Sequence, residues 1–270
     1  MKEIKGLRVF EYDALTYTYL GLNLTQPIFK DIRVRHALAH ATHKEELAAK
    51  IFRGLARPAY APTAPASWVY SDDVEKYPYS IEKARRLFEE AGWKIGKSGI
   101  LEKEGKPFEI TVLTNQGNKE REKGAIVLQS QFKRVGIKVN IRIMEWSALL
   151  KIINAPKDPK DFDAVIIGWS LGVDPDGYSI WHSSEYPRGF NFIAYKNSEV
   201  DRLLEKGRTE MDRNARKEVY VKLHRIISED QPYVFLWYPK AIVGIRDRVG
   251  GLSPPGPAGL MVYMEKVFVR

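Results

Sequence analysis

The sequence contains no cysteine, which excludes disulfide bonds and thiolate metal ligands but leaves the cellular compartment open. It also lacks an apolar run of the ~18–20 residues that a transmembrane helix needs. The first residues lead to Leu7 without the apolar core of a signal peptide, so none is expected in this chain. No internal repeat is visible. What remains is an ordinary composition, 44% hydrophobic over 270 residues, which suffices for one large or two modest domains.

The sequence also has no run of five basic residues, although its formal net charge is +9. Its 43 Lys and Arg are dispersed along the chain and interleaved with 34 Asp and Glu. Nucleic-acid-binding proteins gather basic residues into a patch that follows the phosphates, so we expect no nucleic-acid partner. A charged content of 29% without cysteine also suits a heat-loving source.

The order of predicted elements is that of an α/β protein. Helical periodicity is expected over 31–41, 44–52, 80–91, 119–135 and 147–153, and in segments that begin near Asn197 and Asp212. Strands are expected within 7–24 and at 108–114, 139–143, 162–169, 233–238, 241–245 and 261–269. A hairpin near 97–105 and a long Pro-rich loop at 56–79 separate some of them. Strand, helix and strand across 108–143 form a βαβ unit, which is expected to be parallel and right-handed.

The stretch from Asp163 to Ser184 is the first candidate for a binding site. Its apolar start, Ala164 to Ile167, predicts a strand buried on both faces, and a loop rich in glycine, acids and aromatics follows. Ligands of open α/β sheets bind where strands end. Aromatic surface, charge and hydrogen-bonding groups would come from Trp169, Trp181, Asp174, Asp176, Ser170 and Gly172. The alternative is a loop in which Trp packs on the core and Asp-Pro-Asp-Gly only makes turns, and residue chemistry leaves both open.

Catalytic and metal-binding patterns are weak. His36, His40 and His43 share one helix stripe, but no H-E-x-x-H pattern accompanies them, so we expect a solvated face. Asp174 and Asp176 stand too close in a Pro-containing turn to flank one substrate bond, which disfavours a carbohydrate-active enzyme. We therefore expect no catalytic residue, metal or cofactor. Six Trp and 14 Tyr, many in predicted loops, instead offer stacking surfaces for sugars or peptides, unless they pack beneath those loops.

Several segments in fixed order resemble a known family. They are Tyr19-Leu-Gly-Leu-Asn23, Pro27–Ala41, Tyr79–Trp93, Gln129–Val139, Gly168-Trp169 before Asp174-Pro175, Asn197–Asp201 and Asp230–Leu236. Over about 17–245 the chain closely resembles the family 5 extracellular solute-binding proteins, which are dipeptide and oligopeptide receptors of ABC importers. The resemblance implies no enzymatic activity, but capture of a solute by hinge closure between two lobes.

The resemblance also implies an architecture. We expect a type II periplasmic-binding-protein-like α/β lobe with a mixed sheet flanked by helices, plus short strands that belong to a partner lobe. Because such receptors are roughly twice this length, the chain would correspond to a C-terminal half. Residues 1–18 would form a hinge and partner-lobe segment, 19–240 the ligand-binding lobe, and 241–270 a return segment. Expected partners are the N-terminal lobe and a membrane permease, in the periplasm or outside the cell, with the full receptor anchored to the membrane.

The ligand class follows less directly from the resemblance. In dipeptide receptors an Asp shortly after Gly-Trp holds the α-amino group, whereas the first acid here is Asp174. Their carboxylate-holding Arg lies near the loop Thr114–Asn118, and this chain has no Arg there before Arg121. Longer peptides held through backbone, or oligosaccharides, therefore fit better than strict dipeptides. The expected ligand contacts are Trp169, Ser170, Gly172, Asp174, Asn115, Gln116, Asn118, Trp146 and Trp181.

Overall fold

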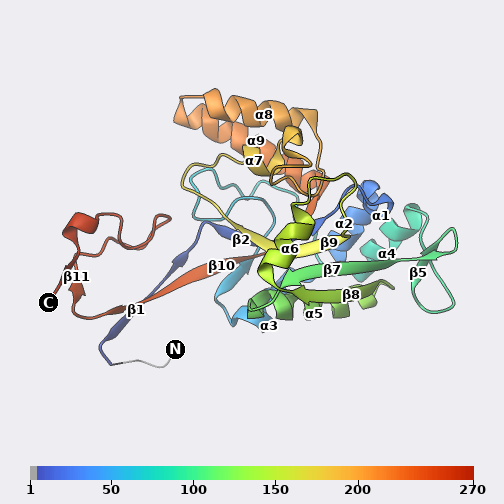
Figure 1. Cartoon of the computed structure of the whole chain (residues 1–270), viewed down its shortest axis with the longest axis horizontal. Helices are drawn as coiled ribbons and strands as arrows, with labels where there is room; N and C mark the ends of the chain where they lie inside the picture. Colours follow the sequence, from blue (N-terminus) through green and yellow to red (C-terminus); the bar gives the residue numbers. More distant parts are fainter. Residues whose placement is uncertain (1–4) are drawn as a thin grey trace.

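A mixed sheet organises the chain in the computed structural model, which describes residues 5–270 (Figure 1). Its seven strands follow the order β1-β10-β2-β9-β7-β8, with β3 beside β10. They are β1 (Leu7–Asp13), β2 (Thr16–Leu22), β3 (Ala56–Pro58), β7 (Glu109–Asn115), β8 (Lys138–Met144), β9 (Ala164–Ser170) and β10 (Tyr233–Arg246). Strands β8, β7 and β9 are parallel, whereas β2 is antiparallel to both β9 and β10. The predicted α/β class and the parallel βαβ unit are confirmed.

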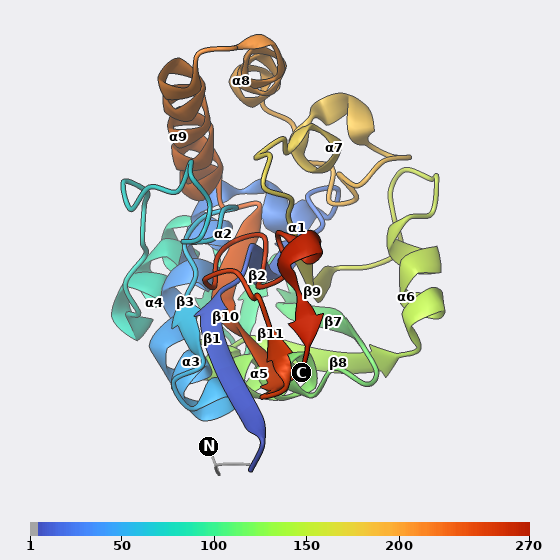
Figure 2. The same ribbon diagram turned by 90° about the vertical axis from the view of Figure 1, so that its left-hand side faces the viewer.

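Helices cover both faces of this sheet and create two separate cores (Figure 2). One face carries α1 (Pro27–Lys30), α2 (Ile32–Ala41), α3 (Lys44–Phe52), α4 (Ile81–Glu90) and α5 (Lys119–Lys133). The other carries α6 (Trp146–Ile153), α7 (Tyr178–Trp181), α8 (Ser198–Thr209) and α9 (Arg213–Asp230). In β9, Ala164 and Ile166 enter the first core while Val165 and Ile167 enter the second. Burial on both faces explains the continuous apolar run of this strand.

Short polar side chains start the main helices as the sequence predicts. Asp31 accepts a hydrogen bond from the amide of Arg33 at 2.9 Å, and Ser80 accepts one from the amide of Lys83 at 3.1 Å. Asn197 and Asp212 cap α8 and α9 in the same way. Each cap satisfies a backbone donor that the first helical turn leaves unpaired. The expected hairpin is a small sheet of β4 (Lys94–Ile95), β5 (Leu101–Lys103) and β6 (Lys106–Pro107).

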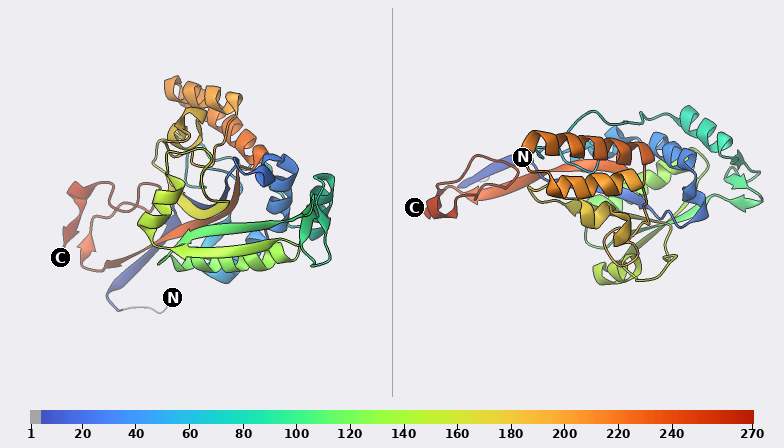
Figure 3. Two further views of the ribbon diagram at one scale, coloured as in Figure 1. Left: turned by 45° about the vertical axis from the view of Figure 1, so that its right-hand side comes forward. Right: turned by 90° about the horizontal axis from the view of Figure 1, so that it is seen from above.

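Two strands leave the helical layers and form an arm, defined here as β1 paired with the second half of β10 (Figures 1 and 3). The register runs from Leu7 opposite Arg246 to Asp13 opposite Lys240. A further segment near the end of the arm contains β11 (Val249–Gly250), a 3-10 turn (Met264–Lys266) and β12 (Phe268–Val269). Strand β2 begins at Thr16, already inside the main sheet.

Three sequence predictions were wrong. The expected strands 233–238 and 241–245 are one strand, because β10 continues through Pro239 while its partners change from β2 and β3 to β1. Of the expected strand 261–269, only Phe268–Val269 is a strand. Met261 and Val262 are exposed and pair with no other strand among residues 5–270. The histidine stripe is not a solvated face: His40 is buried against the carbonyl of Pro78, at 2.7 Å.

No helix within residues 5–270 is both long and apolar enough to cross a membrane.

Candidate functional site

The candidate binding edge is the side of the sheet where β7, β8 and β9 end and β2 begins. Thr16 pairs with Ser170, and Asn115 pairs with Met144, so these strand ends lie in neighbouring positions. The loops at 115–118, 145–146 and 170–177 all leave the sheet here. Carboxyl ends of parallel strands are the usual place for a ligand crevice in an α/β fold. The edge therefore brings together most of the residues that the sequence predicted.

The loop after β7 is built to start helix α5. Asn118 accepts a hydrogen bond from the amide of Arg121 at 2.9 Å, and the amide of Gly117 donates to Glu122 at 2.9 Å. Arg121 turns back toward the strand, where its Nη1 donates to Oδ1 of Asn115 at 2.9 Å. Asn115 and Asn118 thus position a guanidinium, while Gln116 is exposed to solvent. Arg121 was not among the ligand contacts expected from the sequence, although its place in the first turn after Asn118 was a usable signal.

Trp169 and Ser170 close β9 at the same edge. Trp169 is half-buried beside Phe190 and Phe192, with ring centroids 5.6 and 6.2 Å away, and its indole N–H has no hydrogen-bond partner among the described residues. Ser170 is exposed. Trp181 is only 2% exposed and packs on the core, so it offers no surface for stacking on a ligand. For Trp181 the core-packing interpretation is the correct one.

The loop after β9 holds its acidic residues in ion pairs. Arg216 donates to both carboxylate oxygens of Asp174 at 2.9 Å, and this pairing lowers the pKa of Asp174 below its usual value. Arg208 donates to Asp176 at 3.0 Å. Both carboxylates are therefore compensated from α8 and α9. Asp174 and the exposed Gly172 lie in this loop, but Asp174 has no unpaired charge to offer an amino group.

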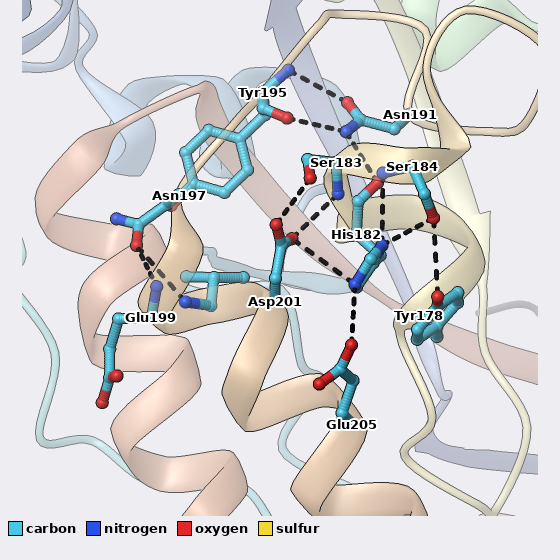
Figure 4. A network of polar contacts seen from close by, with 11 residues as sticks. Tyr178, His182, Ser183, Ser184, Asn191, Tyr195, Asn197, Glu199, Asp201 and Glu205 are labelled. Atoms are coloured by element: carbon cyan, nitrogen blue, oxygen red, sulfur yellow. Dashed lines mark hydrogen bonds and ion pairs between the residues drawn. The ribbon is translucent and has the colours of Figure 1, made fainter.

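A polar network holds the segment 182–195 in place (Figure 4). This segment carries Phe190 and Phe192, which pack against Trp169. Asp201 of α8 accepts from the amide and hydroxyl of Ser183 at 2.8 and 2.5 Å. Asn191 donates to the carbonyls of His182 and Tyr195 at 3.1 and 2.8 Å. The buried side chain of Asn191 thus satisfies backbone carbonyls that water cannot reach. Through these bonds α8 holds the loop that carries Phe190 and Phe192 against the edge.

Trp146 lies at the start of α6, directly after β8. Its side chain is 44% exposed, and Glu145 caps the helix beside it. Across the edge, a cavity of about 400 Å³ opens between α3, α5 and β10, with Arg121 in its wall. The edge therefore carries exposed aromatic surface, amide groups and one guanidinium. This combination can bind a solute by stacking and hydrogen bonding. Within residues 5–270, no group of three or more His, Asp or Glu is arranged to hold a metal ion.

This α/β lobe, with its mixed sheet and projecting arm, shares the fold of the type II periplasmic binding proteins. The family described as "Bacterial extracellular solute-binding proteins, family 5 Middle" matches residues 1–190. The chain belongs to this family, which confirms the resemblance.

Known relatives agree with that assignment. The oligopeptide-binding protein AppA of Bacillus subtilis is 41% identical over 253 residues, covering 93% of this chain and 46% of AppA. The dipeptide-binding protein of Escherichia coli is 26% identical over 93% of this chain and 45% of its own length. The structure of Bacillus subtilis AppA in complex with a nonapeptide matches 98% of this chain and 53% of that one, with a TM-score of 0.88 and 39% identity. The chain spans about half the length of the curated relatives it matches. These relatives give no support to the expected heat-loving source.

Proposed function

We propose that this chain supplies one lobe of a peptide receptor that serves an ABC importer. A peptide would bind at the candidate binding edge, and a partner lobe would close over it about a hinge. The observation that carries the proposal is the arm, in which β1 and the end of β10 leave the lobe together from the same edge of the sheet. Two strands that connect two lobes are suited to hinge motion, because only a few residues need to change conformation.

The division of the chain follows from the same observation. The ligand-binding lobe, expected over 19–240, would begin at Thr16, because Thr16 pairs with Ser170 inside the main sheet. The segments before Thr16 and after Lys240, expected as 1–18 and 241–270, would lead to the partner lobe, with residues 1–4 outside the described part. Ligand would stabilise the closed form more than the open form, and the importer's permease would recognise the closed form. Such a receptor would act in the periplasm or outside the cell, held at the membrane in its full-length form.

A peptide is a better candidate ligand than an oligosaccharide. Trp181 is buried and Trp169 is half-buried, so the two-tryptophan platform expected for a sugar is not available. Exposed Gln116 and Ser170, together with backbone groups of the edge loops, suit hydrogen bonding to an extended peptide backbone. Peptides are also the ligands named for the relatives AppA and the dipeptide-binding protein. The ion pair of Asp174 with Arg216 disfavours a strict dipeptide receptor, because its carboxylate is not free for an α-amino group.

A thermal-shift screen tests the proposal. The chain, joined to its companion lobe, is mixed with peptides of different lengths and with oligosaccharides. Peptides should raise the unfolding midpoint, since a ligand that binds only the folded state stabilises it by mass action. The 270-residue chain alone should bind weakly or not at all, because it supplies half of the crevice. Sub-micromolar binding by the chain alone, or a shift with sugars and not with peptides, would contradict the proposal.

A matched pair of variants locates the binding surface. Trp146→Ala removes an exposed aromatic side chain from the edge, whereas Ile126→Ala removes an exposed apolar side chain, 57% exposed, from α5. We expect Trp146→Ala to weaken peptide binding by about tenfold, in line with the loss of an aromatic contact. Ile126→Ala should leave the dissociation constant unchanged in the same calorimetric titration. Equal affinities for both variants would place the ligand elsewhere.

A further inference from the structure

Strand β8 is the outermost strand of the main sheet, and among residues 5–270 it pairs with β7 alone (Figure 1). The opposite edge belongs to the arm, since β1 stands at the other end of the strand order. The pairing of β8 with β7 is regular from Lys138 to Met144. The strand has neither a proline nor a bulge, two devices by which sheet edges are protected from pairing. It therefore presents a regular, open edge.

The backbone groups along this edge are available to another strand. The even-numbered residues of β8 bond toward β7, as the amide of Lys138 does when it donates to the carbonyl that precedes β7, at 3.0 Å. Successive residues of a strand direct their N–H and C=O groups to opposite sides, so those of Val139, Ile141 and Ile143 point away from β7. The carbonyl of Val139 accepts from Nε2 of Gln129 at 2.8 Å. The outward groups of Ile141 and Ile143 have no partner among residues 5–270.

The side chains of β8 form an apolar row and a polar row. The odd-numbered residues lie on the side of α5, and their row ends in Ile143, which is 47% exposed. The even-numbered residues lie on the other face, where Lys138, Asn140 and Arg142 are exposed. Asn140 and Lys138 contact the carboxylate of Glu109 on β7, at 2.7 and 3.0 Å. The charge of Arg142 has no carboxylate partner among residues 5–270.

The charges of β8 select one register for antiparallel pairing with β8 of a second copy. Such a pair has a two-fold axis, so the residue on the axis determines every opposite pair. An axis at Ile141 pairs the whole strand and sets Arg142 opposite Asn140 and Lys138 opposite Met144. Moving the axis by one residue sets Lys138 opposite Arg142, or Arg142 opposite itself. Like charges directly opposite each other are destabilising, so the two cations favour the axis at Ile141.

We propose that this protein forms a dimer in which β8 pairs antiparallel with β8 of a second copy, about an axis at Ile141. The two main sheets then become one continuous sheet, and the outward backbone groups of both copies gain partners. Because the paired strands run in opposite directions, the two candidate binding edges face away from each other and stay accessible. The arm lies at the opposite edge of each sheet, so a companion lobe can be joined to each copy. Dimerisation in this way requires no ligand and goes beyond the proposed function.

The same register gives both exposed side-chain types of β8 a suitable contact. Ile143 of one copy lies opposite Val139 of the other, beside a groove of about 720 Å³ that Val139 and the exposed Ile126 of α5 line. The apolar row is thereby extended across the axis and its exposed end is covered. On the other face, Arg142 lies opposite the amide group that Glu109 holds. The unpaired guanidinium of each copy thus comes close to a carboxylate of the other.

Sedimentation velocity at rising concentration tests the dimer, with the 270-residue chain alone and with the chain joined to its companion lobe. In both cases the mean mass should rise from one copy toward two. Asn140→Lys should raise the dissociation constant of the dimer by about tenfold, because the new like-charge pair with Arg142 occurs twice about the axis. The double variant Asn140→Lys/Arg142→Glu should restore association, since the lysine then faces a carboxylate. Asn214→Lys, the same change at an exposed position of α9, is the matched control and should have no effect.

Because the chain has no cysteine, single cysteines can report the register directly. Residue 140 of one copy and residue 142 of the other would form a closely spaced pair, with Cα atoms about 4.5 Å apart, which a disulfide can bridge. Two copies of residue 140 would lie about 7–8 Å apart, at or beyond that reach. An oxidised mixture of the Asn140→Cys and Arg142→Cys chains should therefore form a cross-linked dimer at least about tenfold faster than either variant by itself.

The opposite results are equally definite. A mass of one copy at every concentration, or a dimer that Asn140→Lys leaves intact, would overturn the proposal. Association that disappears when the companion lobe is joined would also overturn it, because the contact would then lie on the arm. Equal cross-linking of the mixture and of the single variants would contradict the axis at Ile141. None of these results bears on peptide binding, which the thermal-shift screen tests separately.

Discussion

His224 is a buried titratable group with no role in the candidate site. It lies on α9 beside Tyr220, with ring centroids 6.0 Å apart, and its Nδ1 has no hydrogen-bond partner among the described residues. Burial lowers its pKa to about 3, because the charged imidazolium loses its hydration. The native state therefore keeps His224 neutral over a pH range in which an unfolded chain protonates its histidines, below about 6.5.

This difference makes the stability fall in acid. Between about pH 6.5 and pH 3 the unfolded state binds one proton more at this residue, so protonation favours unfolding by up to about 1.4 kcal/mol per pH unit. We predict that His224→Phe flattens the dependence of the unfolding free energy on pH in this interval, as measured by urea denaturation at pH 7, 5 and 4. Tyr220→Phe changes the same core without removing the imidazole and should keep the original slope. Parallel slopes for the wild type and His224→Phe would contradict the expected acid sensitivity.

Helix α5 contains a glycine whose role comes from packing and not from helix propensity. A Cβ at Gly124 would lie 2.6 Å from Cη2 and 3.1 Å from Cζ3 of Trp237, which is closer than side-chain atoms approach. Trp237 is itself 1% exposed, and its ring also packs against Phe52, with ring centroids 5.3 Å apart. Gly124 therefore lets α5 approach β10 closely.

The substitution Gly124→Ala tests this contact. In an exposed helix interior the change would stabilise the protein by about 1 kcal/mol. Here we expect the opposite sign, a loss of about 1–3 kcal/mol, because the added methyl overpacks the core. Lys123→Ala, at the exposed neighbouring position, should change the unfolding free energy by no more than about 0.5 kcal/mol. A gain in stability with Gly124→Ala would mean that the ring moves aside without cost.

At the element scale, local signals predicted what local interactions build. Caps such as Ser80 and Asp212 and the continuous apolar run of β9 are properties of neighbouring residues, and their elements were correctly predicted. Apart from the parallel βαβ unit, contacts between segments that are distant in the sequence were not predicted. Nothing near Lys160 indicates that its ammonium donates to the carbonyls of Ile153, Ala155 and Pro187 at 2.8–2.9 Å.

In the candidate site, too, the positions of the residues could be predicted from the sequence, whereas the contacts of their side chains could not. Most predicted residues follow strand ends and were therefore found from the sequence. Whether a side chain there faces a ligand or the core depends on the opposite helix layer, which the sequence does not reveal. Trp181 is buried because Tyr195 and Tyr233 surround it, and Asp174 is paired because α9 places Arg216 beside it. Arg121 gained its place through Asn115 and Gly168, which belong to two different strands.

At the scale of the whole molecule, the two halves of strand β10 differ strongly in burial. Its residues 233–238 are buried between strands and helices, whereas 241–246 pair with β1 alone and include the exposed Ile242. Apolar residues on both strands of the arm, Val9 and Ile242, are 40% and 45% exposed. An isolated two-stranded ribbon is only marginally stable in water. The two halves of one strand should therefore open with very different free energies.

Hydrogen exchange measures this difference. In the 270-residue chain we predict amide protection close to the global unfolding free energy at 233–238, and faster exchange by at least about a hundredfold at 241–246, because local opening of the arm breaks few buried contacts. Joining the companion lobe should slow exchange at 241–246 and at 7–13, since the arm would then lie between two folded bodies. Strand β9, already buried on both faces, serves as the internal reference and should not change. Equal protection along β10 in the chain alone would show that the arm is stable by itself. No slowing on addition of the companion lobe would argue against its role as the hinge that the proposed closure requires.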